Sequence, residues 1–218
     1  MTIMSSHPQK IQTLVQSVHM SCQHSIKDAD FYHYAVQSPA TSDARRELVS
    51  RLGDTDDYTS FISGGNTISF WLKLDNASTG INKRYILKLM KNATQAALDL
   101  FFFNDELRIS YEGDTGHRGF KWTGLTLSNF TSGFTNFVIS FGGDTTTAPK
   151  LYINGGAGTS GTHHSGVVGV TTLRTIDRIF IFDDNSGNTL YELQGQLSNL
   201  ALYNTELSQG DASAIYNG

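Results

Sequence analysis

The chain has 218 residues, of which 39% are hydrophobic and only 17% are charged, and its formal net charge is −4. The length suits one large domain with an extension, and a low charged fraction made up by Gly, Ser, Thr and Asn is typical of short strands joined by tight turns. The negative charge excludes a basic surface for nucleic acid or an anionic membrane, and no apolar run approaches the roughly 20 residues of a membrane-spanning helix.

Residues 1–44 differ in pattern from the rest of the chain. Ile11, Leu14, Val15 and Val18 follow the spacing i, i+3, i+4 and i+7, which predicts an amphipathic helix at about residues 9–24. Two interpretations stay open: the helix folds back on its own domain, or it is an arm that docks on a neighbouring subunit. One narrow apolar stripe hardly offsets an ordering entropy of about 1–2 kcal/mol per residue, so we expect this segment to need a surface to fold against.

The N-terminus and the cysteine content bear on where the protein is made. The first residues show no basic segment followed by an apolar one, so we expect no signal peptide and assembly in a cytoplasm. The single cysteine, Cys22, excludes an internal disulfide. Residues 28–34 and the stretch around Pro39 predict an extended connector to the following domain.

From residue 45 onward the apolar residues recur with a period of two. Alternation at 68–74, 106–112 and 137–141 predicts half-buried antiparallel strands, while runs that are apolar on both faces at 85–90, 98–103 and 179–182 predict covered strands. Turn clusters separate these segments, and the chain closes with a predicted strand at 193–203 and a short helix. Many short strands without intervening helices favour a sandwich or a barrel.

Six segments, taken in order, resemble the laminin-G-like branch of the concanavalin A-like jelly rolls. They are residues 54–58, 68–72, 105–111, 134–141, 150–155 and 197–216. The resemblance implies an all-β, antiparallel two-sheet jelly-roll sandwich at 45–218, with residues 1–44 as a partly helical N-terminal extension and a short C-terminal helix.

The resemblance also implies a function. This fold is a binding and structural scaffold far more often than a catalyst, and such domains recur in tailed-phage virions as capsid decorations and tail or fibre modules. We therefore expect a non-enzymatic structural or attachment protein on a virion surface, assembled in the host cytoplasm with other virion proteins and copies of itself. The alternative is a stand-alone carbohydrate-binding lectin.

Catalysis by paired carboxylates is not expected. The family's glucanases carry a Glu-x-Asp-x-x-Glu pattern, and none of the five glutamates of this chain lies in one. Glu106 and Glu112 are six residues apart on one predicted strand, where we expect both to face solvent.

A calcium ion is possible, although no cofactor is required. Laminin-G-like domains often bind one Ca²⁺ through oxygen ligands, and the candidate ligands here form two acidic turns. They are Asp54, Asp56 and Asp57, and Asp183 and Asp184. The alternative is that these aspartates cap turns through hydrogen bonds to the backbone. Where related sequences place aspartates in the final strand, this chain has Ser198 and Asn199, which weakens a site there.

A glycan site would need an aromatic platform beside hydrogen-bonding groups. Trp122 with His117, Arg118 and Lys121, in a predicted loop at 113–122, meets that description, and Tyr152 is a further candidate. The alternative is that Trp122 covers the edge of the core. We expect His163 and His164 to lie in a solvated glycine-rich loop.

Overall fold

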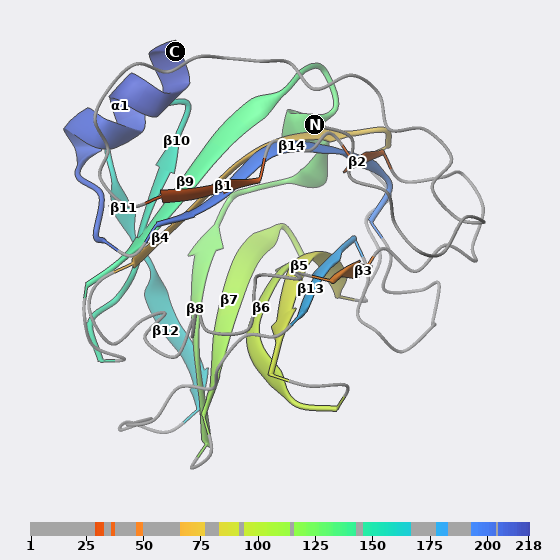
Figure 1. Ribbon diagram of the computed structural model, residues 1–218, viewed down its shortest axis with the longest axis vertical. Helices are drawn as coiled ribbons and strands as arrows, with labels where there is room; N and C mark the ends of the chain where they lie inside the picture. Colours follow the sequence, from red (N-terminus) through yellow and green to blue (C-terminus); the bar gives the residue numbers. More distant parts are fainter. Residues whose placement is uncertain are drawn as a thin grey trace.

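The computed structural model describes residues 66–76, 83–91, 94–113, 116–142, 146–166, 180–182, 193–203 and 205–218, together with the backbone of 29–32, 36–37, 47–49 and 178–179. These residues form two antiparallel sheets packed face to face, with one α-helix on the outside and a short 3-10 helix, η2 (Leu127–Phe130) (Figure 1). The predicted all-β jelly-roll sandwich with a short C-terminal helix is confirmed.

Sheet A has seven strands among the described residues, in the order β1-β14-β4-β9-β10-β11, with β2 also paired to β14. They are β1 (Ala29–Tyr32), β2 (Val36–Gln37), β4 (Asn66–Leu74), β9 (Thr135–Phe141), β10 (Lys150–Ile153), β11 (Thr159–Ser160) and β14 (Gly195–Tyr203).

Sheet B also has seven strands in the described part of the chain, in the order β12-β8-β7-β6-β5-β13-β3. They are β3 (Glu47–Val49), β5 (Arg84–Met90), β6 (Ala96–Phe103), β7 (Glu106–Gly113), β8 (Gly116–Thr123), β12 (Thr162–Gly166) and β13 (Arg178–Ile181).

The core lies between the inner faces of the two sheets. In β7 the side chains of Leu107, Ile109 and Tyr111 are buried, whereas the residues between them are partly exposed, as the period of two predicts. From sheet A, Phe70 stacks on Phe137 with ring centroids 5.2 Å apart. Burial of each such side chain contributes about 1.5–3 kcal/mol, so this layer stabilises the sandwich.

The outer face of sheet A is covered by helix α1 (Gln209–Asn217), visible beside β10 in Figure 1. The helix begins at Ser208, whose hydroxyl accepts a hydrogen bond from the Asp211 backbone N–H while the Asp211 carboxylate accepts one from the Ser208 backbone N–H. Ala212 is fully buried against Val138 and Tyr152. The end of the chain thus covers this part of the outer face of sheet A.

Part of the predicted N-terminal extension belongs to sheet A. Strand β1 pairs with β14 in register from Ala29↔Tyr203 to Tyr32↔Leu200, and β2 pairs with the other end of β14. Within the predicted connector at 28–34, the described residues 29–32 are extended. The predicted helix at 9–24, with Ile11, Leu14, Val15 and Val18, lies outside the described residues. No helix in the described part of the chain is long and apolar enough to span a membrane.

Candidate functional site

The outer face of sheet B carries a group of charged side chains from three neighbouring strands. We call Glu106, Arg108, Lys121 and His164 the outer-face cluster. Because alternate residues of a strand face opposite ways, the inward Leu107 and Ile109 leave Glu106 and Arg108 facing out on β7. Lys121 of β8 lies directly opposite Arg108 in the ladder. Between His163 and Ser165 the β12 register shifts, and His164 is the residue at that irregularity.

The carboxylate of Glu106 is the centre of the outer-face cluster. It accepts hydrogen bonds from Arg108 Nε at 2.8 Å and from Lys121 Nζ at 2.7 Å, while Arg108 Nη1 lies 2.7 Å from His164 Nε2. The side chains are only partly accessible, with 14% of Glu106, 15% of Arg108 and 27% of Lys121 exposed. Such charge-assisted bonds in a half-buried setting hold the side chains in fixed positions.

The charges in the cluster shift the titration of two of its members. Burial alone would raise the pKa of Glu106, but the hydrogen bonds and positive charges of Lys121 and Arg108 outweigh it, so the pKa is lowered. Burial, followed by the positive charges of Arg108 and Lys121, lowers the pKa of His164. At neutral pH Glu106 is therefore ionised, and a neutral His164 accepts the Arg108 hydrogen bond.

Aromatic rings lie beneath the cations on this face. The Arg108 guanidinium carbon lies 4.4 Å from the ring centroid of Phe103, which is partly exposed. Further along the sheet, Lys83 Nζ lies 4.8 Å from the ring centroid of Phe101, and Lys88 Nζ lies 5.1 Å from that of Tyr85. These cation–π contacts continue the row of cations and rings from β7 to β5, but the rings of Phe101 and Tyr85 are buried, whereas Phe103 is partly exposed.

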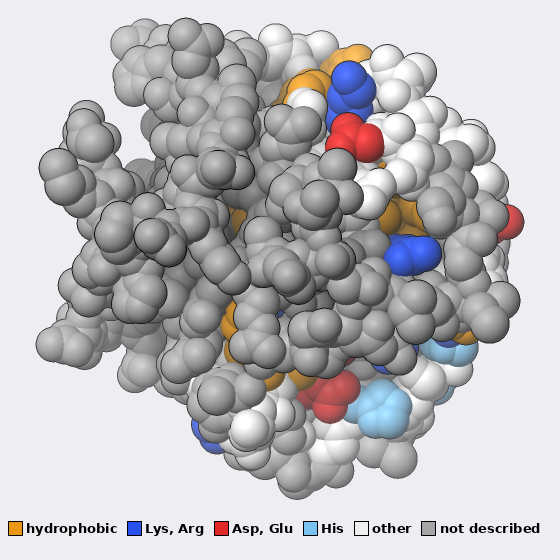
Figure 2. Space-filling model, turned by 90° about the vertical axis from the view of Figure 1, so that its right-hand side faces the viewer, with side chains coloured by type: hydrophobic (Ala, Val, Ile, Leu, Met, Phe, Trp, Pro, Cys, Tyr) orange, Lys and Arg blue, Asp and Glu red, His pale blue; other side chains and the backbone are white. Residues whose placement is uncertain are grey.

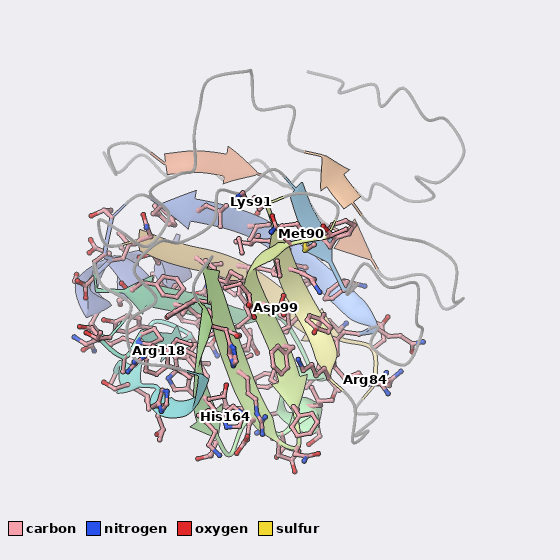
Figure 3. All side chains as sticks on the ribbon, turned by 90° about the horizontal axis from the view of Figure 1, so that it is seen from below. Arg84, Met90, Lys91, Asp99, Arg118 and His164 are labelled. Atoms are coloured by element: carbon pink, nitrogen blue, oxygen red, sulfur yellow. The ribbon has the colours of Figure 1, made fainter. Side chains whose placement is uncertain are left out.

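Figure 3 labels several residues of this part of the molecule, and Figure 2 shows one of its faces. Figure 3 shows strands β5 to β8 from below, with Asp99 among them and with Arg118 and His164 on the side of β12. On the face drawn in Figure 2, acidic and histidine side chains lie next to one another near the lower edge. Among the described residues, Glu106, Arg108 and Lys121 of sheet B face outward, whereas α1 packs against Val138 and Tyr152 on the outer face of sheet A.

In the predicted loop at 113–122, the described residues are the end of β7 and most of β8. This places the residues that the prediction grouped on opposite faces of a strand. On an extended strand His117 and Lys121 face outward, whereas Arg118 and Trp122 face inward. His117 is exposed and lies opposite Glu112. The predicted loop at His163 and His164 is likewise strand β12 at the edge of sheet B.

Trp122 is buried rather than presented as a platform. Only 4% of it is exposed, its ring belongs to the core, and its Nε1 donates a hydrogen bond to the Thr159 carbonyl at 2.8 Å. The position of Trp122 therefore agrees with the alternative interpretation, in which its side chain covers the edge of the core. Its ring is not available to stack on a sugar in this structure.

Tyr152 lies on the other sheet, far from the outer-face cluster in the strand order. It is 4% exposed and packs against Ala212 of α1. Burial, followed by the negative charges of Glu206 and Asp211, raises its pKa. The structure therefore does not bring Tyr152 together with His117 and Lys121.

Arg108, Phe103 and His164 were not predicted as members of one surface. A signal was present for Arg108, because the alternation at 106–112 already placed Glu106 and Arg108 on a common face. Their pairing with Lys121 follows once residues 106–123 are read as a hairpin. The position of His164 on this face depends on a register shift in β12, and the sequence pattern does not predict that shift.

The predicted calcium ligands Asp54, Asp56, Asp57, Asp183 and Asp184 all lie outside the described residues, so calcium binding stays a prediction. Within the part of the chain that the structure describes, there is no group of three or more His, Cys, Asp or Glu side chains that could hold a metal ion.

Glu106 and Glu112 are not arranged as a pair of catalytic carboxylates. They face the same way on β7 but are six residues apart, which corresponds to about 20 Å along a strand. Glycoside hydrolases place their two carboxyl groups about 5–9.5 Å apart. Glu106 is also held as a carboxylate by two cations, which makes it a poor proton donor.

Comparison with known proteins defines the class to which this fold belongs. A family described as the concanavalin A-like lectin/glucanases superfamily, of the laminin G type, matches residues 52–213. The chain therefore belongs to this superfamily. Among curated proteins, no match is found.

Solved structures with the same fold include binding domains of botulinum neurotoxins. The receptor-binding domain of botulinum neurotoxin D aligns with a TM-score of 0.59 at 14% identity, covering 88% of this chain and 48% of that one. The receptor-binding domain of the C/D mosaic serotype aligns with a TM-score of 0.55 at 16% identity, covering 72% and 37%.

A serotype D ligand-binding domain in complex with N-acetylneuraminic acid aligns with a TM-score of 0.53 at 14% identity, covering 88% of this chain and 46% of that one. The chain thus spans less than half the length of each of these proteins. At these identities the likeness concerns the fold.

Proposed function

We propose that this chain is a non-catalytic attachment module that binds a surface glycan through the outer-face cluster. The observation that carries the proposal is the half-buried network of Glu106, Arg108 and Lys121 beside the Phe103 ring. Sugars are recognised by fixed polar groups that bind hydroxyls and by aromatic rings that contact their apolar faces. Membership of a lectin/glucanase superfamily and the likeness to receptor-binding domains support this class of function.

The chemistry of the network suits hydroxyl recognition. Lys121 donates one of its three ammonium hydrogens to Glu106. The Glu106 carboxylate has about four acceptor positions, and the hydrogen bonds from Arg108 and Lys121 occupy only some of them. The remaining donors and acceptors are held in place before a ligand arrives, which reduces the entropy lost on binding. The non-enzymatic part of the proposal is supported by the wide spacing of Glu106 and Glu112.

A glycan array probed with wild type and two variants tests the proposal. We expect binding that is lost in Lys121→Gln and retained in Lys150→Gln, which removes the same charge from an exposed position on sheet A. An array without any hit, with and without calcium, would refute glycan binding. Equal loss in both variants would show that net charge matters and the cluster does not.

We further propose that the protein acts on the surface of a tailed-phage virion, as a capsid decoration or a tail or fibre component, together with copies of itself. The resemblance of this fold to phage modules and the predicted amphipathic helix at 9–24 support this context. The alternative, a lectin that acts alone, needs no such helix.

The size of the protein in solution separates these two contexts. Light scattering after size exclusion compares the full chain with Leu14→Asp and with a 26–218 truncation, which keeps β1 and its pairing to β14. Oligomers of the full chain that dissociate in both variants support an assembly arm. Monomers throughout, with no association to any particle, would contradict the virion proposal and leave the lectin.

A further inference from the structure

Arg118 holds a positive charge inside the protein with few hydrogen-bond partners among the described residues. Only 8% of the residue is exposed, yet its Nε and Nη1 have no acceptor in this part of the chain. Nη2 donates to the carbonyl of Thr146 at 3.4 Å, which is long for a hydrogen bond. A guanidinium carries five N–H donors in a rigid planar arrangement, so most of its binding capacity is unused.

Among the described residues, no carboxylate is paired with the positive charge of Arg118. It lies on the inner side of β8, with its guanidinium carbon 5.3 Å from the ring centroid of Phe120. The nearby Tyr111 is almost completely buried, and burial raises the pKa of its hydroxyl, so this side chain stays neutral. An unpaired buried cation is costly, and it calls for an anion.

The described acceptor of the guanidinium belongs to a surface segment. It is the carbonyl of Thr146, a residue that is exposed together with the following Thr147. A ligand oxygen that takes the place of the Thr146 carbonyl would therefore reach the guanidinium without crossing the core. Arg118 faces away from the outer-face cluster, so this position is separate from the proposed glycan surface.

We propose that Arg118 is the centre of a second ligand site, which binds a carboxylate group at this end of the sandwich. A carboxylate presents two oxygens to several guanidinium donors at once and supplies the missing negative charge. The carboxylate can belong to a free organic acid or to an acidic sugar. The site is independent of the proposed glycan surface and stands if that surface binds nothing.

The test is a titration of the full-length protein with sodium glucuronate at constant ionic strength. Binding is followed by calorimetry and by the Nε–Hε NMR signal of Arg118, which is assigned from its disappearance in Arg118→Lys. We expect a saturable shift of this signal. Glucose, which has a hydroxymethyl group where glucuronate has its carboxylate, should have no effect at equal concentration. Arg118→Gln should bind glucuronate at least ~30-fold more weakly than wild type. The control variant Lys150→Gln should bind glucuronate with the wild-type affinity.

Sodium acetate distinguishes the two sources of the carboxylate. Equal affinity for acetate and glucuronate supports a site for any small carboxylate, and tighter binding of glucuronate supports an acidic sugar. No saturable shift with either anion would overturn the proposal, and so would an equal response to glucose. If Arg118→Gln fails to fold, the NMR titration of the wild-type protein decides alone.

Discussion

Trp71 and Tyr216 stack with ring centroids 5.6 Å apart and an interplanar angle of 20°. Trp71 lies on the outer face of β4, and Tyr216 is in the last turn of α1, so this contact joins the end of the chain to sheet A. Gly155, in the turn after β10, packs closely against Ser213 and Tyr216 of the helix. The ring contact therefore depends on how closely this turn approaches α1.

Gly155→Ala should weaken the docking of α1. An added Cβ would lie 2.9 Å from Ser213 Cα and 3.1 Å from Tyr216 Cβ, at a φ of +66° that disfavours alanine. We expect a loss of about 1–3 kcal/mol in the free energy of unfolding, measured by urea denaturation. Gly133→Ala is the control, since nothing lies within 4 Å of the added atom and no positive φ applies. Equal stability of both variants would contradict the close approach seen here.

Thr67→Val should loosen the segment that leads into α1. The Thr67 hydroxyl accepts a hydrogen bond from the Leu207 N–H at 3.0 Å and donates to the Thr205 carbonyl at 2.9 Å. Valine has a similar shape but leaves the buried Leu207 N–H unpaired, which costs about 1–3 kcal/mol. The control is Thr123→Val at an exposed position, which should change the free energy of unfolding by less than about 0.5 kcal/mol. Faster amide exchange at Leu207 in Thr67→Val would be the specific sign.

Glu106→Gln should lose more stability at neutral pH than in acid. The folded protein lowers the pKa of Glu106 below its ordinary value of 4.5, so the ionised carboxylate stabilises the fold above that pH. This contribution disappears as the pH falls from 4.5 through the lowered value, because the folded and unfolded states then bind the same proton. The difference in unfolding free energy between wild type and Glu106→Gln should therefore shrink from pH 7 to pH 3. A difference that grows towards acid would contradict the assignment.

His164→Gln should reduce the acid sensitivity of the fold. Burial and the neighbouring cations lower the pKa of His164 below 6.5, so protonation is more favourable in the unfolded chain. The wild type should therefore lose stability as the pH falls from about 6.5 through the lowered folded value, and the variant should lose less. Unfolding curves at pH 7.5, 6.5 and 5.5 measure the difference. His117→Gln is a control at an exposed position of the same face, and an identical change in both variants would argue against the Arg108–His164 contact.

The fold was predictable from local patterns. The period of two at 68–74, 106–112 and 137–141 predicted strands, and the structure contains β4, β7 and β9 there. The terminal helix was likewise expected. The strands at 29–32 and 36–37 were read only as extended, because pairing with β14 depends on residues more than 150 positions away.

The candidate site was predictable only in part. Lys121 and His117 were named and do face outward, but Trp122 and Arg118 were grouped with them although they point into the sandwich. Reading 113–122 as a loop removed the alternation that separates the two pairs. The three glycines of this segment favoured a loop. Gly119, however, is paired with Ser165 of β12, and an added Cβ would lie 2.6 Å from the Ser165 hydroxyl oxygen. Glycine is therefore needed at this position because of the strand pairing.

By itself, the sequence determined the fold class and which face of each regular strand turns inward, because alternation of apolar and polar residues depends on the backbone geometry of a single strand. The tertiary structure decided which outward side chains meet. Glu106, Lys121 and His164 come from three strands, and their contact depends on strand order and on a register shift in β12. It also decided that Arg118 is buried with its Nε and Nη1 unpaired among the described residues, since burial is a property of the packed sheets and not of any one segment.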